Sequence, residues 1–238
     1  MDREHSPHPI CGTGNDARYR LRYAAPRDIP EIRDLERRSG EPFRDIGLDV
    51  IADDDPPDEA TLHAAVLGHS VLGHAVFVVE DGGDNRRTPG GSTSGRTPPT
   101  GQRPDPAPRP LIAWMWLSVV DGDVLVEQVS VDPGYRGQRI GAGLLRTAVE
   151  CAARHGLPGV VLTTFRDVPW NGPLYRRQGF TDMRAETIGP ELRTVRCRET
   201  ASGLDVLPRV CLRLDTSGIR TLTPQDAVRA PRGRSPAR

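Results

Sequence analysis

The sequence predicts an α+β protein in which a central mixed β-sheet has helices on both faces. Three observations lead to this class. Short apolar runs in the middle of the chain follow one another in hairpin order, as antiparallel strands do. A glycine-rich turn and an amphipathic helix then lead to another such run, and a strand–helix–strand crossover pairs in parallel and is right-handed. Further segments with helical periodicity lie on both sides of this central region.

The first part of the domain is predicted to contain two strands separated by two helices. Residues 19–23 alternate between polar and apolar side chains, as a half-buried strand does. A proline opens the segment 26–40, in which apolar residues recur at helical spacing before a terminal glycine. Residues 43–55 give no clear pattern. Residues 58–67 favour a second helix, and residues 71–80 favour a strand.

Residues 81–110 have almost no apolar side chains and are rich in Gly, Pro, Ser and Thr. Such a segment cannot bury enough surface to offset its ordering entropy. We therefore predict a disordered insertion in a hairpin loop, which the fold tolerates because loop-closure entropy grows slowly with length. Residues 1–17 are predicted to be a flexible extension and residues 216–238 a disordered basic tail, so the domain spans residues 18–215.

The second part of the domain has the clearest turn and helix-end signals. A tight Asp-Gly-Asp turn separates two apolar runs, and glycines follow two of the periodic segments. In chain order, the predicted elements are strands at 111–120 and 123–131, a helix from Ile140 to Gly156, a strand at 160–165, helices at 170–180 and 190–202, and a strand at 209–215.

Composition narrows the class of function. The chain has 32 basic and 32 acidic residues, so no overall positive charge favours nucleic acid. It has no apolar run near the roughly 20 residues of a membrane helix, and its first residues do not resemble a signal peptide. Its four cysteines form no C-x-x-C pair. We expect a cytoplasmic protein, monomeric or homodimeric, with reduced thiols, no metal, no membrane and no nucleic-acid partner.

The stretch "VDPGYRGQRIGAGLLRTAVE", residues 131–150, joins a strand to a helix through a glycine-rich turn. A nucleotide-triphosphate loop requires a lysine, and this chain contains none. A dinucleotide turn requires a third glycine where Arg146 stands. A helix N-terminus beside glycines and Arg136 and Arg139 is nevertheless a suitable site for another phosphate group. The alternative is a turn that binds nothing.

This stretch resembles the acyl-CoA-binding motif of the GNAT N-acetyltransferase superfamily, with the core [RQ]-x-x-G-x-[GA] at Gln138, Gly141 and Gly143. "LTTFRDVPWNGPLYRRQGF" is similar to the next motif of that family, and "GPELRTVRCRETASGLDVLPRV" resembles a bacterial subgroup. The resemblance implies a sheet of about six to seven strands and acetyl-CoA as acyl donor. The residues that it implies for binding the cofactor are Val129, Ser130, Val131, Arg136, Gly137, Gln138, Arg139, Ile140, Gly141, Ala142, Gly143 and Asn171.

The resemblance also implies two catalytic residues. Glu127 corresponds to a carboxylate that removes a proton from the acceptor amine, directly or through water. Tyr175 corresponds to a tyrosine that protonates the departing thiolate. Each has a structural alternative: Glu127 as a solvated or structural glutamate, Tyr175 as a packed aromatic, and Asn171 as a helix N-cap only.

Other candidates have weaker support. His63, His69 and His74 fit no metal motif, and Trp114 and Trp116 either pack or line an acceptor cleft. The acidic residues 53–58 are expected in a solvated loop, although they could attract a cationic amine. We therefore expect an N-acetyltransferase acting on a primary amine of a small molecule or protein, with a catalytically silent acyl-CoA-binding module as the alternative. Acceptor identity is expected to depend on residues 40–60 and 183–205.

Overall fold

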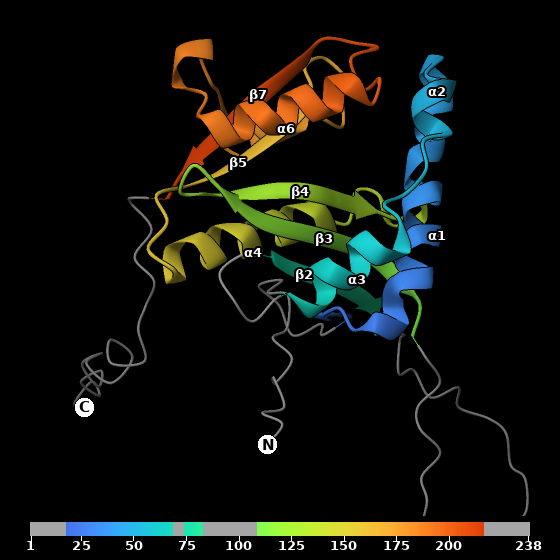
Figure 1. The fold of residues 1–238 in the computed structure, drawn as a ribbon. Helices are drawn as coiled ribbons and strands as arrows, with labels where there is room; N and C mark the ends of the chain where they lie inside the picture. Colours follow the sequence, from blue (N-terminus) through green and yellow to red (C-terminus); the bar gives the residue numbers. More distant parts are fainter. Residues whose placement is uncertain (1–17, 69–73, 83–108, 217–238) are drawn as a thin grey trace, which may run out of the picture. The chain divides into compact units, whose positions relative to one another are not determined.

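A computed structural model describes residues 18–68, 74–82 and 109–216 of the chain (Figure 1). Its strands form one seven-stranded mixed sheet in the order β1-β2-β3-β4-β5-β7-β6. This sheet, together with the helices, confirms the predicted α+β class. The strands are β1 (Tyr19–Tyr23), β2 (His74–Asp81), β3 (Leu111–Val120), β4 (Asp123–Val131), β5 (Gly159–Phe165), β6 (Thr181–Asp182) and β7 (Arg209–Asp215).

The described residues divide into two compact units. The first contains the described residues up to Trp116 together with Gln128–Gly143. The second contains Leu117–Glu127 and the described residues from Leu144 onward. Strands β3 and β4 and helix α4 (Ile140–Arg154) contribute residues to both units.

In the first unit, β1 and β2 pair antiparallel, with Tyr19 opposite Asp81 and Tyr23 opposite Phe77. Apolar residues at helical spacing form the buried side of α1 (Ile29–Gly40) and α3 (Glu59–Leu67). Figure 1 shows these helices in blue and cyan. Their core with the strands contains Ile29, Ile32, Leu35, Leu62, Ala65, Val66, Val76, Val78, Leu111 and Trp114.

A buried ion pair joins β1 to the start of α1. The guanidinium of Arg22 donates to both carboxylate oxygens of Asp28 and to Glu80. Burial alone would raise the pKa of the Asp28 carboxyl, but the hydrogen bonds from Arg22 and from the amide of Ala25 lower it below its usual range. The pair therefore favours the folded state above the pKa of an ordinary Asp, and this contribution is lost as the pH falls through the lower pKa of folded Asp28.

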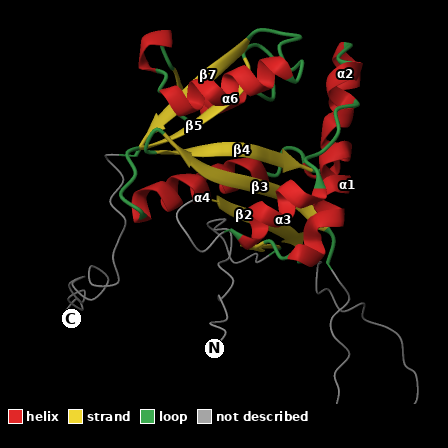
Figure 2. Ribbon diagram, viewed as in Figure 1, coloured by secondary structure: helices red, strands yellow, loops and turns green. Residues whose placement is uncertain are grey.

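In the second unit, β5 lies between β4 and β7 (Figure 2). It pairs parallel with β4, as predicted for a strand–helix–strand crossover, and antiparallel with β7. Helix α6 (Pro190–Ala201) lies across β5 and β7 in Figure 1. Leu192 of this helix packs in a cluster with Val120, Leu125, Val161 and Cys211 of the strands.

The β3–β4 hairpin is linked to α6 by Asp121. Asp121 and Gly122 both have left-handed backbone conformations, with φ of 50° and 82°, as a two-residue Asp-Gly hairpin turn requires. The carboxylate of Asp121 accepts hydrogen bonds from the amides of Glu191 and Leu192, at 3.1 and 2.9 Å. Because first-turn amides have no partner within a helix, the hairpin turn supplies the cap that α6 needs.

Most predicted elements agree with the structure to within a few residues. Residues 43–55, which gave no pattern, contain a short 3₁₀ segment (Glu41–Ile46) and α2 (Asp49–Ala52). Strand β6 was not predicted, and the helix predicted at 170–180 is limited to α5 (Gly172–Arg177). Residues 71–73, most of the predicted insertion, residues 1–17 and residues 217–238 lie outside the described residues. Thr216, which was assigned to the disordered tail, is instead buried, and its hydroxyl donates to the carbonyl of Leu157 at 2.7 Å.

Candidate functional site

The glycine-rich turn lies in the first unit, between the end of β4 and the start of α4. Residues 136–139 are exposed, and both Gly137 and Arg139 have left-handed backbone, with φ of 79° and 60°. Glycine adopts this conformation readily, whereas an arginine does so at an energetic cost. The two left-handed residues turn the backbone sharply just before the helix begins.

Contacts on both sides hold this turn. The carboxylate of Asp132 accepts hydrogen bonds from the amide of Gly134 and the guanidinium of Arg38, both at 2.9 Å. The hydroxyl of Tyr135 donates to Asp81 at 2.7 Å, and the hydroxyl of Tyr19 donates to the side chain of Gln138. The turn is therefore tied to α1, β1 and β2 of the same unit.

Within the described part of the chain, the first backbone hydrogen bond of helix α4 runs from the amide of Gly143 to the carbonyl of Arg139, at 3.0 Å. The amides of Ile140, Gly141 and Ala142 precede it, in the first turn, where a helix offers its amides no internal partner. At Gly141 an added β-carbon would meet a side-chain carbon of Val131 at 3.6 Å, an ordinary contact distance. The turn thus combines left-handed glycine, exposed arginines and donor groups suited to an anion.

The predicted residues of β4 fall in both units. Val129, Ser130 and Val131 end the strand in the first unit, next to the turn. Glu127 lies in the second unit and is half-buried. Its carboxylate accepts a hydrogen bond of 2.6 Å from the hydroxyl of Ser118 on β3. This bond fixes one carboxylate oxygen, and Glu127 keeps acceptor capacity on the other.

Sequence reasoning missed a second carboxylate, Glu36 of α1, in the first unit. It accepts hydrogen bonds from the indole of Trp114, at 2.7 Å, and from the side-chain amide of Gln128. Burial raises the pKa of the Glu36 carboxyl, even though the hydrogen bonds oppose this shift. The only signal in the sequence was an acidic residue directly after the apolar residue Leu35.

The two tryptophans of β3 pack against the core of the first unit. Trp114 is fully buried, and Trp116 is partly buried beside the same core. The indole of Trp116 donates to His74.

Asn171 stands at the N-cap of α5, as predicted, but its side chain does not cap the helix. Its side-chain amide instead donates to the hydroxyl of Thr164 on β5 at 2.9 Å. The backbone ψ of −115° at Asn171 differs from the extended conformation of a capping residue, which accounts for the difference. Its side-chain oxygen is buried and has no hydrogen-bond partner among the described residues. The capping part of the prediction is wrong, and an acceptor remains available for a ligand.

Tyr175 lies on α5 in the second unit and is 9 % exposed. Its ring meets Phe180 edge-on, with the ring centroids 5.9 Å apart. Burial raises the pKa of Tyr175 to about 12, and the nearby charge of Arg209 opposes that shift. The phenol therefore stays protonated at neutral pH, as a proton donor must. The packed-aromatic alternative is compatible with the same burial.

Two of the acidic residues in the segment 53–58 have local partners. Asp53 pairs with Arg44, and Asp58 caps α3 by accepting from the amide of Thr61 at 2.8 Å. In the described ranges, His, Cys, Asp and Glu side chains do not gather in groups that could hold a metal ion. The described helices are all too short or too polar to cross a membrane.

Comparison with known proteins identifies the fold and a matching domain family for part of the chain. Residues 109–182 match the family model of the acetyltransferase (GNAT) domain. The PaiA N-acetyltransferase of Thermoplasma acidophilum, solved in complex with coenzyme A, is 12% identical, with 83% of this chain and 98% of that chain covered and a TM-score of 0.54. The ribosomal-protein-S18-alanine N-acetyltransferase of Escherichia coli is 15% identical, covering 85% and 96%, with a TM-score of 0.51. A GNAT-family acetyltransferase of Staphylococcus aureus Mu50 is 13% identical, covering 84% and 99%, with a TM-score of 0.55.

Residues 109–182 therefore match an acetyltransferase (GNAT) domain, and the described residues share the fold of solved GNAT acetyltransferases. The family match covers β3, β4, the glycine-rich turn, α4, β5 and α5, and so includes every residue predicted to bind the cofactor or act in catalysis. At these identities the solved structures establish the fold alone.

Proposed function

We propose that this protein transfers an acetyl group from acetyl-CoA to a primary amine by direct attack of the amine on the thioester. The observation that carries this proposal is the glycine-rich turn. It presents the first-turn amides of α4, which have no partner within the helix, beside exposed Arg136 and Arg139. Backbone donors at a positive helix end, with cations nearby, suit the pyrophosphate of coenzyme A. The T. acidophilum structure, which holds coenzyme A in a similar fold, supports the same assignment.

The proposed chemistry assigns a role to each of two residues. Glu127 accepts a proton from the ammonium form of the acceptor, because an alkyl amine with a pKa of about 10 is mostly charged at neutral pH. The neutral amine attacks the thioester carbonyl and forms the C–N bond, collapse of the tetrahedral intermediate breaks the C–S bond, and the nitrogen loses its second proton to solvent. The hydroxyl of Tyr175 donates a hydrogen bond to the departing thiolate, which takes its proton from solvent. The pKa of about 12 at Tyr175 keeps the hydroxyl hydrogen in place, so a hydrogen bond to the thiolate already stabilises the leaving group.

The test is thiol release from acetyl-CoA in the presence of a panel of primary amines, with product acetylation followed by mass spectrometry. We expect amine-dependent release for at least one member of the panel. Acetyl-CoA binding measured by calorimetry, with no turnover across amino acids, polyamines, aminoglycosides and peptide N-termini, would instead identify a catalytically silent acyl-CoA-binding module.

A further inference from the structure

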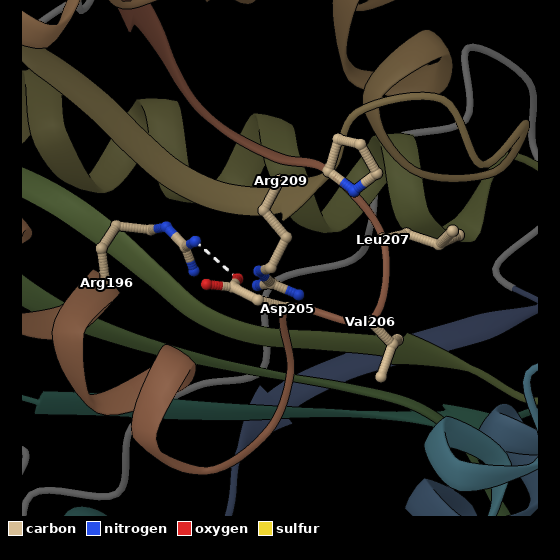
Figure 3. A pocket seen from close by; sticks show the side chains of 6 residues that line it. Arg196, Asp205, Val206, Leu207 and Arg209 are labelled. Atoms are coloured by element: carbon tan, nitrogen blue, oxygen red, sulfur yellow. Dashed lines mark hydrogen bonds and ion pairs between the residues drawn. The ribbon is translucent and has the colours of Figure 1, made fainter.

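The second unit contains a surface hollow that the proposed chemistry does not use. It is formed by the end of α6, the segment before β7 and the first residue of β7. Figure 3 shows the side chains of Arg196, Asp205 and Arg209 converging at one end of it. Its lining residues are Arg196, Asp205, Val206, Leu207, Pro208 and Arg209. One side is therefore charged and the rest is largely apolar.

The charged side is a chain of alternating charges. Arg196 donates to Asp205 at 2.7 Å and also to Glu199. The other oxygen of Glu199 accepts from Arg209 at 3.0 Å. The order is thus Asp205, Arg196, Glu199, Arg209, with a cation at the inner end. The remaining oxygen of Asp205 accepts from the hydroxyl of Thr200, so both carboxylates are already engaged on both oxygens.

The guanidinium of Arg209 has N–H donors that make no hydrogen bond within the described residues. Its side chain is 9 % exposed, and only Nη2 donates, to Thr163 and Glu199. Nε is buried without a hydrogen-bond partner in the described part of the chain. Burial lowers the pKa of the Arg209 guanidinium even though Glu199 favours its charge. A buried guanidinium that is hydrogen-bonded to one carboxylate and has unused donors is incompletely compensated, and an anionic ligand would complete its environment.

We propose that this hollow binds a carboxylate of the acceptor, with Arg209 as the binding residue, so that the acceptor is an amino acid or a compound bearing both an amine and a carboxylate. A guanidinium with free donors matches the planar, singly charged carboxylate. Val206, Leu207 and Pro208 would contact an apolar part of the same molecule. A cationic group is disfavoured because Asp205, the acidic residue of the lining, already binds Arg196.

The hollow also lies at the end of the second unit that carries Tyr175, as a site for the acceptor should. Arg209 pairs in register with Phe165, the last residue of β5, and its guanidinium lies 4.9 Å from the ring centroid of Phe165. Asn171 and Tyr175 follow β5 directly, and the charge of Arg209 acts on the Tyr175 hydroxyl. The proposed carboxylate site and the tyrosine therefore share one end of the second unit. This inference rests on the proposed acetyl transfer for its substrate class, but not for the binding itself.

The test compares acids with their amides on the unaltered protein. The twenty common amino acids and their carboxamides are assayed for acetylation, and the N-acetyl derivatives of both series are titrated calorimetrically into the protein with coenzyme A. We expect at least one acid to be preferred over its amide by about 10- to 100-fold, as loss of a charged hydrogen bond requires. Equal response to acids and amides, or to neither, overturns the carboxylate site. If amides are acetylated as well as acids, the carboxylate site is overturned but the proposed acetyl transfer stands.

Variants then locate the site. Arg209→Met should abolish the preference for the acid, whereas Arg198→Met, at an exposed arginine of the same helix as Arg196, should keep it. Because removal of Arg209 alone leaves the half-buried Glu199 less compensated, the double variant Arg209→Met, Glu199→Gln removes both charges if the single variant does not fold. An acid preference that survives in a folded Arg209 variant would show that the carboxylate binds elsewhere and would overturn the assignment.

Discussion

Gly172 and the backbone of Arg166 lie so close together that any side chain at position 172 would collide. A β-carbon added to Gly172 would be 2.3 Å from the carbonyl oxygen of Arg166 and 3.0 Å from its carbonyl carbon. Both neighbours are backbone atoms, which cannot rotate away. This close approach places the first turn of α5 directly against the end of β5, and it determines where Tyr175 lies one turn later.

We therefore expect Gly172→Ala to disturb stability and chemistry together. Displacement of α5 should cost about 1–3 kcal/mol of unfolding free energy, the usual range for overpacking a buried site. It should also lower kcat, because Tyr175 moves with the helix. Denaturant unfolding and steady-state kinetics measure the two effects. The control is Gly203→Ala, at a glycine with open space around it but positive φ, which should lose stability through backbone strain without a change in kcat.

Replacing Tyr175 with Phe removes the hydroxyl and keeps the ring that packs against Phe180. If the hydroxyl stabilises the leaving thiolate, kcat should fall about 100-fold, while the melting temperature and the affinity for acetyl-CoA stay close to those of the unaltered protein. Rapid-quench kinetics must first establish that chemistry limits turnover. Unchanged kcat under that condition would leave Tyr175 with a packing role only.

The pH dependence gives an independent measure of the same group. A proton donor works in its protonated form, and a raised pKa extends that form to higher pH. Because burial raises the pKa of Tyr175 to about 12, kcat should show no decline from loss of this proton below about pH 11. A profile from pH 7 to 10.5 tests this. A decline near pH 10 that is present in the unaltered enzyme and absent from Tyr175→Phe would indicate an ordinary tyrosine pKa and contradict the burial.

The affinity for acetyl-CoA should respond to a single methyl group at Gly141. The fold can accept Gly141→Ala, because the new β-carbon would be 3.6 Å from Val131 and alanine favours helix. The methyl group would, however, occupy space beside the first-turn amides. We expect acetyl-CoA to bind about tenfold more weakly, equivalent to about 1.4 kcal/mol, in calorimetry, with an unchanged or higher melting temperature. Unaltered affinity in both Gly141→Ala and the bulkier Gly141→Val would mean that this turn does not bind the pyrophosphate.

The connection between β2 and β3 can be shortened. The amide of Asp81 donates to the carbonyl of Pro110 at 3.2 Å, so the two ends of the connection are adjacent. Replacing residues 83–108 with Asn-Gly should keep the melting temperature within about 5 °C, because a two-residue turn closes such a hairpin. A Gly/Ser segment of the original length serves as the control for loop entropy. Failure of both variants to fold would show that the native segment contributes packing.

Local patterns predicted the elements whose structure is determined locally. Asp58 caps α3, and Asp121-Gly122 forms the hairpin turn between β3 and β4, because short polar residues and glycine specify those conformations within a few positions. Asn171 has a suitable residue type for a cap, but its hydrogen bond goes to Thr164 on another element. Contacts of that kind depend on tertiary placement, which a single sequence does not encode in its spacing.

The candidate site also contains residues that the sequence could predict and residues that depend on tertiary contacts. The turn around Gly141 follows from glycine spacing and a helix start, and the positions of Glu127 and Tyr175 follow from family resemblance. The roles of these residues stay predictions. Glu36 and Arg209 could not be found from the sequence, since each becomes notable only when side chains from two other elements contact it. Arg209, for example, depends on Thr163 of β5 and Glu199 of α6.

The cap that Asp121 provides to α6 has a consequence for local unfolding. The carboxylate that holds the first amides of the helix is carried by the hairpin turn, 70 residues earlier in the chain for Glu191 and 71 for Leu192. Opening the turn removes the cap, and fraying the helix leaves the carboxylate without its donors. The hairpin end and the start of α6 should therefore exchange their amide hydrogens with solvent together, as one cooperative segment, despite their separation along the chain.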